Sequence, residues 1–274
     1  MSYRIIMDSC GELLDEWKND TTYEPIPFTM TVDGVEIIDD ETFDQADFLR
    51  RVAASPECPK SACPSPGRYL QALQRYPADH YYIVTITGNL SGSYNSAVLS
   101  ISLFREGHPD AKAHAFNSCS ASVGETLIAM KIRECEEKGL SFEEVVSTVD
   151  AYIESQNTFF ILENLDTLRK NGRLNGMKSL VVSALKIKPI MCATPEGEIQ
   201  QLSQARGINK AVAKMADYMV ESTGGAVDRI IAISHCNCRE RAEQLKSILE
   251  KRGNWKKILI LEMAGPSSMY AKDG

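Results

Sequence analysis

Residues 85–94 form a turn rich in hydroxyl groups and glycine, and they carry the most distinctive chemistry of the chain. They read Thr-Ile-Thr-Gly-Asn-Leu-Ser-Gly-Ser-Tyr and join an apolar run, 81–84, to a helix-like run, 96–104. Hydroxyl and backbone N–H groups at a helix start converge on one point, where the helix dipole favours a negative group. No base, metal-ligand set or phosphate-binding lysine lies close by in the sequence. The turn therefore predicts a site that holds an anion, with an ordinary helix cap as the alternative.

The residues that could support catalysis do not form a recognisable motif. Ser91 could be a nucleophile, but a serine hydrolase also needs a base and an orienting acid, and the run from Gly88 to Gly92 lacks the spacing of a nucleophile elbow. A P-loop and a dinucleotide-binding fingerprint are both absent. Asp8 could accept a phosphoryl group or bind a metal, although an Asp-Ser pair more often forms a turn. All four histidines suit structural or surface positions: His80, His108, His114 and His235.

Arg173 stands out because it follows an Asn-Gly pair between two apolar elements. A guanidinium there could supply positive charge to an anionic ligand or hold a junction between domains. The more common role of such a residue is a surface charge at the C-terminus of a helix.

Cysteine usage gives little support for a metal site. The chain has eight cysteines, which we interpret as reduced thiols in a chain of this length. The one suggestive cluster is His235-Cys236-Asn237-Cys238, but zinc normally takes four ligands and no second pair with matching spacing exists. We therefore expect no metal and interpret this run as a strand that ends in a turn.

Composition narrows the class of protein. The formal net charge of -7 argues against non-specific binding of nucleic acid, which requires a basic surface. No apolar stretch approaches the roughly 20 residues of a transmembrane helix. The N-terminus runs directly into a strand pattern rather than a signal peptide. These features predict a cytoplasmic protein without a transmembrane segment.

Strand and helix patterns alternate through the first half of the chain. This alternation predicts a parallel or mixed sheet with helices on its faces, in which ligands sit outside the carboxyl ends of the strands. Three strand-end loops carry hydroxyl groups: 8–9, 85–93 and 117–120. A hairpin is expected around the Asp33-Gly34 pair. We predict strands at 3–7, 81–87 and 112–116, with helices at 45–54, 66–75, 94–106 and 122–138.

The second half has a different pattern, and we place a domain boundary near residue 156, in a polar run. The two predicted domains are residues 1–156 and residues 157–274. A short helix at 164–173 is expected to end at a glycine C-cap. We predict further helices at 141–155, 178–185, 208–223 and 239–252, with strands at 158–162, 228–234 and 256–262.

Taken together, these runs resemble the DegV family of bacterial fatty-acid-binding proteins over nearly the whole chain. The opening strand with its Asp8-Ser9 turn, the Lys60–Gly67 segment and the Leu90-Ser91-Gly92-Ser93-Tyr94 loop are each similar to a family motif. The most specific match is a pair of runs in the right order. These are Leu165-Asp166-Thr167-Leu168-Arg169-Lys170-Asn171-Gly172-Arg173 and Lys186-Ile187-Lys188-Pro189-Ile190.

The resemblance implies a two-domain α/β fold, with a mostly parallel N-terminal sheet, a C-terminal α+β domain and one long-chain fatty acid between them. It implies a carrier without catalytic residues or cofactor, which presents the bound acid to a separate fatty acid kinase that makes the acyl-phosphate. By the same resemblance, Ser91 and the Gly92 N–H hold the carboxylate and Ser61 adds a hydroxyl. Arg173 matches the arginine proposed for kinase interaction or phosphotransfer.

Several positions depart from the family pattern. Ala62 and Cys63 replace a polar Ser-Gln pair, which makes that side of the pocket less polar. Asn117 stands where many members have aspartate. Met263 takes the place of a histidine near the carboxylate, and the last residues, 268–274, resemble a subset that ends in Tyr-Ala-x-Asp/Asn-Gly-Gly. A final strand would be expected after residue 274, which suggests truncation.

Two alternatives to the carrier remain at this point. One is a hydrolase or an acyl or phosphoryl transferase with Ser91 as nucleophile. The other is a binding protein for a different amphiphile, which the methionine at position 263 makes plausible.

Overall fold

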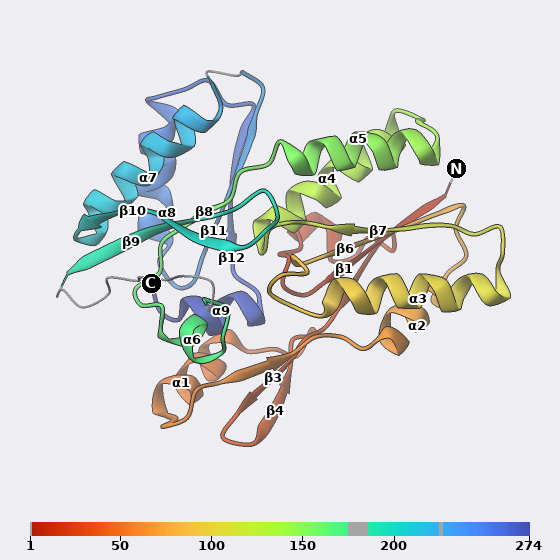
Figure 1. The fold of residues 1–274 in the computed structure, drawn as a ribbon, viewed down its shortest axis with the longest axis horizontal. Helices are drawn as coiled ribbons and strands as arrows, with labels where there is room; N and C mark the ends of the chain where they lie inside the picture. The colour runs from red at the N-terminus through yellow and green to blue at the C-terminus, as the bar shows by residue number, and fades with distance from the viewer. Residues whose placement is uncertain (1, 175–185, 225–226) are drawn as a thin grey trace.

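A four-stranded parallel sheet organises the N-terminal half in the computed structural model, which describes residues 2–174, 186–224 and 227–274 (Figure 1). The strand order is β2-β1-β6-β7, and all three pairings are parallel. Both central strands are buried almost throughout, as expected for a sheet covered on both faces. The bounds are β1 (Tyr3–Asp8), β2 (Tyr23–Ile26), β6 (His80–Thr85) and β7 (Lys112–Asn117).

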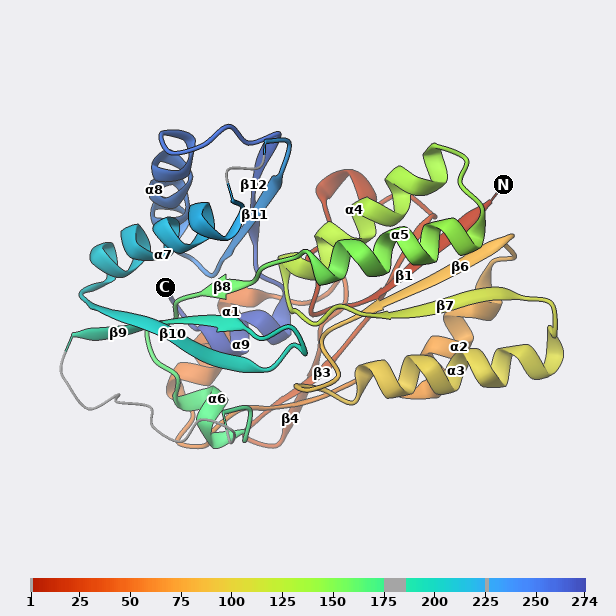
Figure 2. The same ribbon diagram turned by 45° about the horizontal axis from the view of Figure 1, so that its top comes forward.

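Helices cover both faces of this sheet, as the alternating pattern predicted (Figure 2). On one face Ile6 and Ile83 pack against α2 (Pro66–Arg75) and α3 (Ser93–Gly107). On the other face Ile5 and Tyr82 pack against α4 (Val123–Glu137) and α5 (Phe142–Glu154). A short 3-10 helix, η1 (Asp15–Trp17), places Trp17 in the same core.

A small antiparallel sheet lies below the main one, with strand order β4-β3-β5. It contains β3 (Thr29–Val32), β4 (Val35–Ile38) and β5 (Lys60–Ala62). The expected hairpin at Asp33-Gly34 is confirmed, since both residues have positive φ, 50° and 76°, as a type I′ turn requires. Helix α1 (Gln45–Ala54) follows, and the side chain of Asp44 caps it by accepting the Asp47 N–H.

The C-terminal half combines an antiparallel sheet, β10-β9-β8, with a parallel pair, β11-β12. Helices α7 and α8 pack against these strands around the buried side chains of Ile190 and Ile233. The predicted strand at 158–162 is wrong in length, because only two residues pair with β9. The helix predicted at 178–185 lies outside the described residues. The bounds are β8 (Phe159–Phe160), α6 (Asp166–Lys170), β9 (Ile187–Ala193), β10 (Ile199–Arg206), α7 (Ile208–Ser222), β11 (Ile230–His235), α8 (Arg239–Glu250), β12 (Lys257–Glu262) and α9 (Gly265–Ala271).

One hydrophobic cluster crosses residue 156, where we placed the domain boundary. Met30 and Phe48, from the small sheet and α1, pack with Leu165, Met191 and Met269 from the second half. Residues 28–54 belong to the N-terminal half by sequence, but they pack against the C-terminal half. Across the described residues no helix combines the length and the apolar character needed to cross a membrane.

Candidate functional site

The three hydroxyl-bearing loops meet at the carboxyl edge of the parallel sheet, as their strand-end positions predicted. The Ile86 N–H donates to Asp8 Oδ2 at 3.1 Å, which joins the first loop to the second. The Thr87 N–H donates to the Ser120 carbonyl at 2.8 Å, which joins the second loop to the third. The predicted strand at 81–87 ends at Thr85, because the next residues turn into this junction.

The loop that leads into α3 presents the predicted anion-binding groups. Gly92 occupies the N-cap position, and α3 runs on for 15 residues. The Ser93 N–H donates to Ser91 Oγ at 3.2 Å, so the serine oxygen acts as an acceptor toward the helix while its own proton stays free to donate elsewhere. An acceptor of that proton would also meet the positive end of the helix dipole.

Strand β5 brings Ser61 to the same place. It pairs with β3 in register Met30↔Ser61. A Cβ added to Gly92 would lie 3.3 Å from Cys63 Sγ, so the segment after β5 touches the loop before α3. Ser61 and Ser91, which are 30 positions apart in sequence, thus come to one site because the small sheet lies under the main one.

These groups line a cavity of about 440 Å³ between the two halves of the chain. Ser61, Ser91, Gly92 and Arg173 all belong to its wall, so the structure brings together every residue predicted for the site. Most of the remaining wall is apolar and comes from both halves: Phe28, Ile86, Leu90, Val123, Phe159, Phe160, Leu162, Leu168, Ile199 and Met263.

Arg173 lies in the wall of this cavity, next to the loop before α3. Its Nε donates to the Leu90 carbonyl at 3.2 Å, and its Nη1 donates to the Asn171 carbonyl at 2.5 Å. The preceding Gly172 ends the short helix with φ of 76°, which confirms the predicted glycine C-cap. Within the described part of the chain no carboxylate pairs with Arg173. Its charge is therefore available to an anion at the loop.

Asp8 stabilises the loop before α3, residues 86–92, which we call the head-group loop. It is fully buried, and its Oδ2 accepts from Ser93 Oγ at 2.5 Å as well as from the Ile86 N–H. Ser93 Oγ also pairs with the Tyr69 hydroxyl at 2.6 Å. The Cys10 N–H donates to Asp8 Oδ1 at 3.2 Å, which is an Asx turn. The turn expected for Asp8 is therefore present, and Asp8 also belongs to a buried group of possible metal ligands, since its carboxylate, the Cys10 thiol and the Glu125 carboxylate offer atoms that lie within 4.8 Å of one another.

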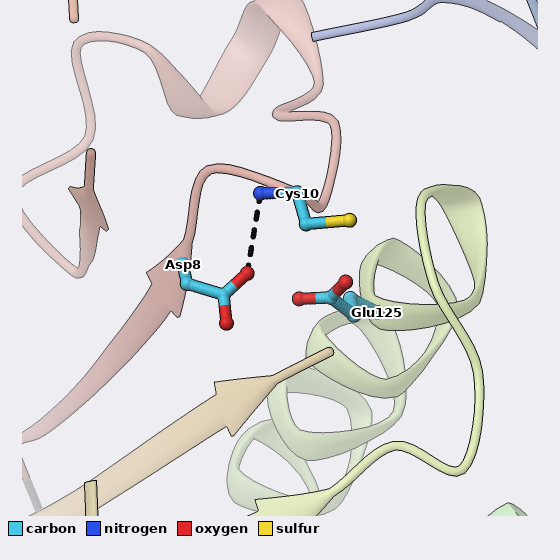
Figure 3. Close-up of side chains that lie close together, drawn as sticks. All are labelled: Asp8, Cys10 and Glu125. Carbon is cyan, nitrogen blue, oxygen red and sulfur yellow. Dashed lines mark hydrogen bonds between the residues drawn. The ribbon is translucent and has the colours of Figure 1, made fainter. Parts of the chain in front are cut away.

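Glu125 faces Asp8 beside the Cys10 thiol (Figure 3). Glu125 is fully buried, and neither of its carboxyl oxygens has a hydrogen-bond partner among the described residues. Burial, together with the adjacent Asp8 carboxylate, holds the pKa of Glu125 well above its usual range. Burial raises the pKa of Asp8 as well, but Asp8 accepts three hydrogen bonds and Glu125 accepts none among the described residues, so Asp8 is the better anion of the pair.

Two further buried acids lie close to the cavity wall. Ser122 Oγ lies 2.7 and 2.9 Å from the two Glu12 oxygens, and burial raises the pKa of Glu12 to about 8. Asp39 Oδ1 accepts the Gly265 N–H at 3.0 Å, and burial raises the pKa of Asp39 to about 6. Sequence reasoning missed these acids, since a single acidic residue in a polar turn gives no signal of burial.

The structure does not assemble a hydrolase around Ser91. No histidine is among the described residues of the cavity wall. His80 is buried on the far side of the sheet, where its Nδ1 lies 2.6 Å from Glu136 Oε1. The run His235-Cys236-Asn237-Cys238 ends β11 in a turn, as predicted, with φ of 51° at Asn237, and it contributes no clustered metal-ligand set in the parts of the chain that are described.

The sequence also did not predict a contact that the second half of the chain makes with the site. The β9–β10 turn lies on the head-group loop, where Asn89 Nδ2 donates to the Glu196 carbonyl at 2.6 Å. Gly197 has φ of 81°, and its Cα approaches Thr87 and Cys119 so closely that any Cβ would collide. The Pro195-Glu196-Gly197 run is a recognisable turn signal, but nothing in the sequence indicates which loop it meets.

Comparison with known proteins places the chain in a family. Residues 2–272 match the model of the family described as "Uncharacterised protein, DegV family". A DegV domain-containing protein of Streptococcus pneumoniae is 36% identical over 279 residues, which cover 100% of this chain and 97% of the relative.

Solved structures show the same fold. A DegV family protein of Ruminococcus gnavus, described with vaccenic acid, has a TM-score of 0.96 and 49% identity, with 100% of this chain and 97% of that chain covered. The Fatty Acid Kinase (Fak) B3 protein of Streptococcus pneumoniae, loaded with linoleic acid, has a TM-score of 0.90 and 35% identity over the same shares of the two chains. A DegV family protein of Eubacterium eligens, loaded with heptadecanoic acid, has a TM-score of 0.88 and 26% identity, again over 100% and 97%. By sequence and by fold, this chain belongs to the DegV family.

Proposed function

We propose that this protein binds a long-chain fatty acid in the cavity between its two halves and presents the carboxylate to a separate fatty acid kinase. The observation that carries the proposal is the wall of the cavity, in which Ser61, Ser91 and Arg173 adjoin a mainly apolar surface. The acids bound by the Ruminococcus, Streptococcus and Eubacterium relatives have the same two parts, an anionic head and a long apolar tail.

The head-group residues match the needs of a carboxylate. An anion taken out of water without hydrogen bonds becomes protonated or costs several kcal/mol. The hydroxyls of Ser61 and Ser91, the Gly92 N–H and the start of α3 supply donors and a positive dipole end. Arg173, fixed to the Leu90 carbonyl, adds a full positive charge beside the same loop.

The apolar wall accounts for retention of the tail. Each buried CH₂ contributes about 0.8 kcal/mol, so a long chain held away from water binds tightly. Such a ligand does not exchange readily into water, and presentation of its head group lets a partner react with it in place.

We assign catalysis to the kinase rather than to Ser91. The serine oxygen accepts the Ser93 N–H, and the described wall of the cavity offers it no histidine. We place the protein in the cytoplasm, where a kinase finds ATP, and the eight free cysteines suit a reducing compartment.

Mass spectrometry of the denatured, purified protein tests the binding. We expect a co-purified long-chain fatty acid, and we expect the delipidated protein to take one up again. Replacement of both hydroxyls, Ser61→Ala with Ser91→Ala, removes two hydrogen bonds to a charged group, at about 1.5–3 kcal/mol each, and should lower affinity by roughly a hundredfold or more. Ser102→Ala, on the exposed face of α3, is the matched control. Absence of any bound acid before and after loading would refute the proposal, as would ester hydrolysis by the protein alone that Ser91→Ala abolishes.

Arg173→Met separates binding from presentation. We expect the variant to keep its fatty acid, because Ser61 and Ser91 still hold the carboxylate and the apolar wall still holds the tail, and to lose at least tenfold in acyl-phosphate formation with a bacterial fatty acid kinase and ATP. Arg173→Lys keeps the positive charge but lacks the planar guanidinium group, and it should recover only part of the rate of acyl-phosphate formation. If Arg173→Met loses the fatty acid itself, the guanidinium belongs to the head-group site and has no separate role toward the kinase.

A further inference from the structure

Three hollow spaces meet at the short strand β8. The first is the cavity of about 440 Å³ that holds the head-group residues. The second is a chamber of about 140 Å³ beneath α7 and α8, lined by Val212, Met215, Ala242 and Leu245 among others. The third is an outer groove of about 590 Å³ between α4–α5 and the β11–β12 pair, with Lys131, Gln156 and Arg229 in its wall.

The cavity and the chamber adjoin along a shared wall that includes Phe159, Phe160 and Met263. Strand β8 pairs only with β9, and β11 belongs to the other C-terminal sheet. No backbone ladder is described between β8 and β11, so side chains alone separate the two spaces there. An acyl tail longer than the cavity can therefore extend past β8 into the apolar chamber.

Phe159 is the one described residue that lines all three spaces. Its neighbour Phe160 lines the cavity and the chamber but not the groove. Successive side chains of a strand point to opposite faces, which explains the difference. Phe160 packs with the cluster around Met30 and Met191, whereas Phe159 packs toward α7 and α8.

We propose that the Phe159 ring is the barrier that closes the distal end of the lipid tunnel and sets the longest acyl chain the protein retains. This inference rests on the proposed function and names the residue that determines its specificity. Beyond Phe159 the surface of the groove is mainly apolar and includes Met130 and Trp255, together with the charged groups of Lys131 and Arg229. An acyl tail that passed the ring would therefore bury further methylene groups there. Selection of chain length thus falls to one aromatic side chain.

Competition among fatty acids of different length tests the barrier. The delipidated protein is loaded with an equimolar series of straight-chain acids from lauric to behenic, and the bound acids are quantified by mass spectrometry. Phe159→Ala joins the tunnel to the groove. Each methylene that becomes accommodated adds about fourfold in affinity, so acids two carbons longer than the wild-type preference should gain about fifteenfold relative to it. Phe159→Trp should shift the bound population toward shorter acids.

Phe160→Ala is the matched control, because it widens the shared wall without opening the groove. We expect it to lower retention of all acids and to leave the ratio between lengths near the wild-type value. An unchanged length profile in both Phe159 variants, or an equal shift in Phe160→Ala, would overturn the inference. The Trp variant keeps an aromatic ring in place and decides the question if Phe159→Ala does not fold. A wild-type protein that takes up no acid of any length would instead refute the proposed function.

Discussion

Replacement of Glu12 by glutamine should stabilise the protein, and the gain should grow with pH. Glu12 is 3% exposed, and burial raises its pKa from an ordinary 4.5 to about 8. The single proton of Ser122 Oγ cannot serve both carboxyl oxygens, although that atom lies within hydrogen-bond distance of each. The arrangement fits a protonated carboxyl that donates through one oxygen and accepts through the other. Glutamine has the same shape and the same donor and acceptor, but it cannot ionise.

The direction in which pH changes the free energy of unfolding follows from proton linkage. Between pH 4.5 and about pH 8 the folded protein holds a proton on Glu12 that the unfolded chain has released. Its contribution to stability is fully present below pH 4.5 and is lost as pH rises, at about 1.4 kcal/mol per pH unit. At pH 7 the wild-type protein has thus lost about 3 kcal/mol that the Glu12→Gln variant keeps.

Urea unfolding of the lipid-free protein measures this difference across the same pH range. We expect the variant and the wild type to agree near pH 4.5 and to separate steadily above it. Glu143→Gln replaces an exposed glutamate on α5 and should show no such trend. A stability difference between Glu12→Gln and the wild type that does not vary with pH would show that Glu12 is ionised in the folded state and would refute the argument.

Two other substitutions probe the support of the head-group loop. Ser93→Ala removes one of the three donors to buried Asp8 and the partner of the Tyr69 hydroxyl, which should lower the free energy of unfolding by about 2–4 kcal/mol in denaturant titration, whereas exposed Ser102→Ala should change it little. Gly197→Ala should destabilise by more than about 2 kcal/mol, because its Cβ would meet Thr87 and lie 2.7 Å from Cys119 Cα in a backbone with φ of 81°. Gly34→Ala has a similar φ of 76° with nothing within 4 Å, so it isolates the cost of the dihedral alone; equal losses in the two glycine variants would contradict a steric clamp.

Local signals in the sequence were sufficient for several elements. Helices α1 and α2 begin and end where predicted, because Asp44 and Ser65-Pro66 are strong N-terminal signals that need no tertiary information. The Asp33-Gly34 hairpin is local in the same sense. Strand β5 has only three residues, and its pairing with β3 defines it rather than any pattern of its own. Helix α9, after Gly265-Pro266, was likewise not predicted.

The candidate site shows the same division between local and non-local information. Ser61, Ser91, Gly92 and Arg173 could be named from motif resemblance, and all four line one cavity. Phe159 could not be named, because its importance comes from three spaces that meet only after folding.

Three buried acids, Asp8, Glu12 and Glu125, lie next to residues of the cavity wall without lining the cavity themselves. Ionised Asp8, Glu12 and Glu125 would together oppose a bound carboxylate, since like charges in a poorly solvated region repel strongly. Burial raises the pKa of all three carboxyl groups, and Asp8 is the one whose negative charge Ser93 and the Ile86 N–H stabilise. Neutral Glu12 and Glu125 do not offset the positive charge of Arg173 or the positive end of the α3 dipole. Burial, which raises the pKa of Glu12 and Glu125, therefore reduces the negative charge near the proposed carboxylate site.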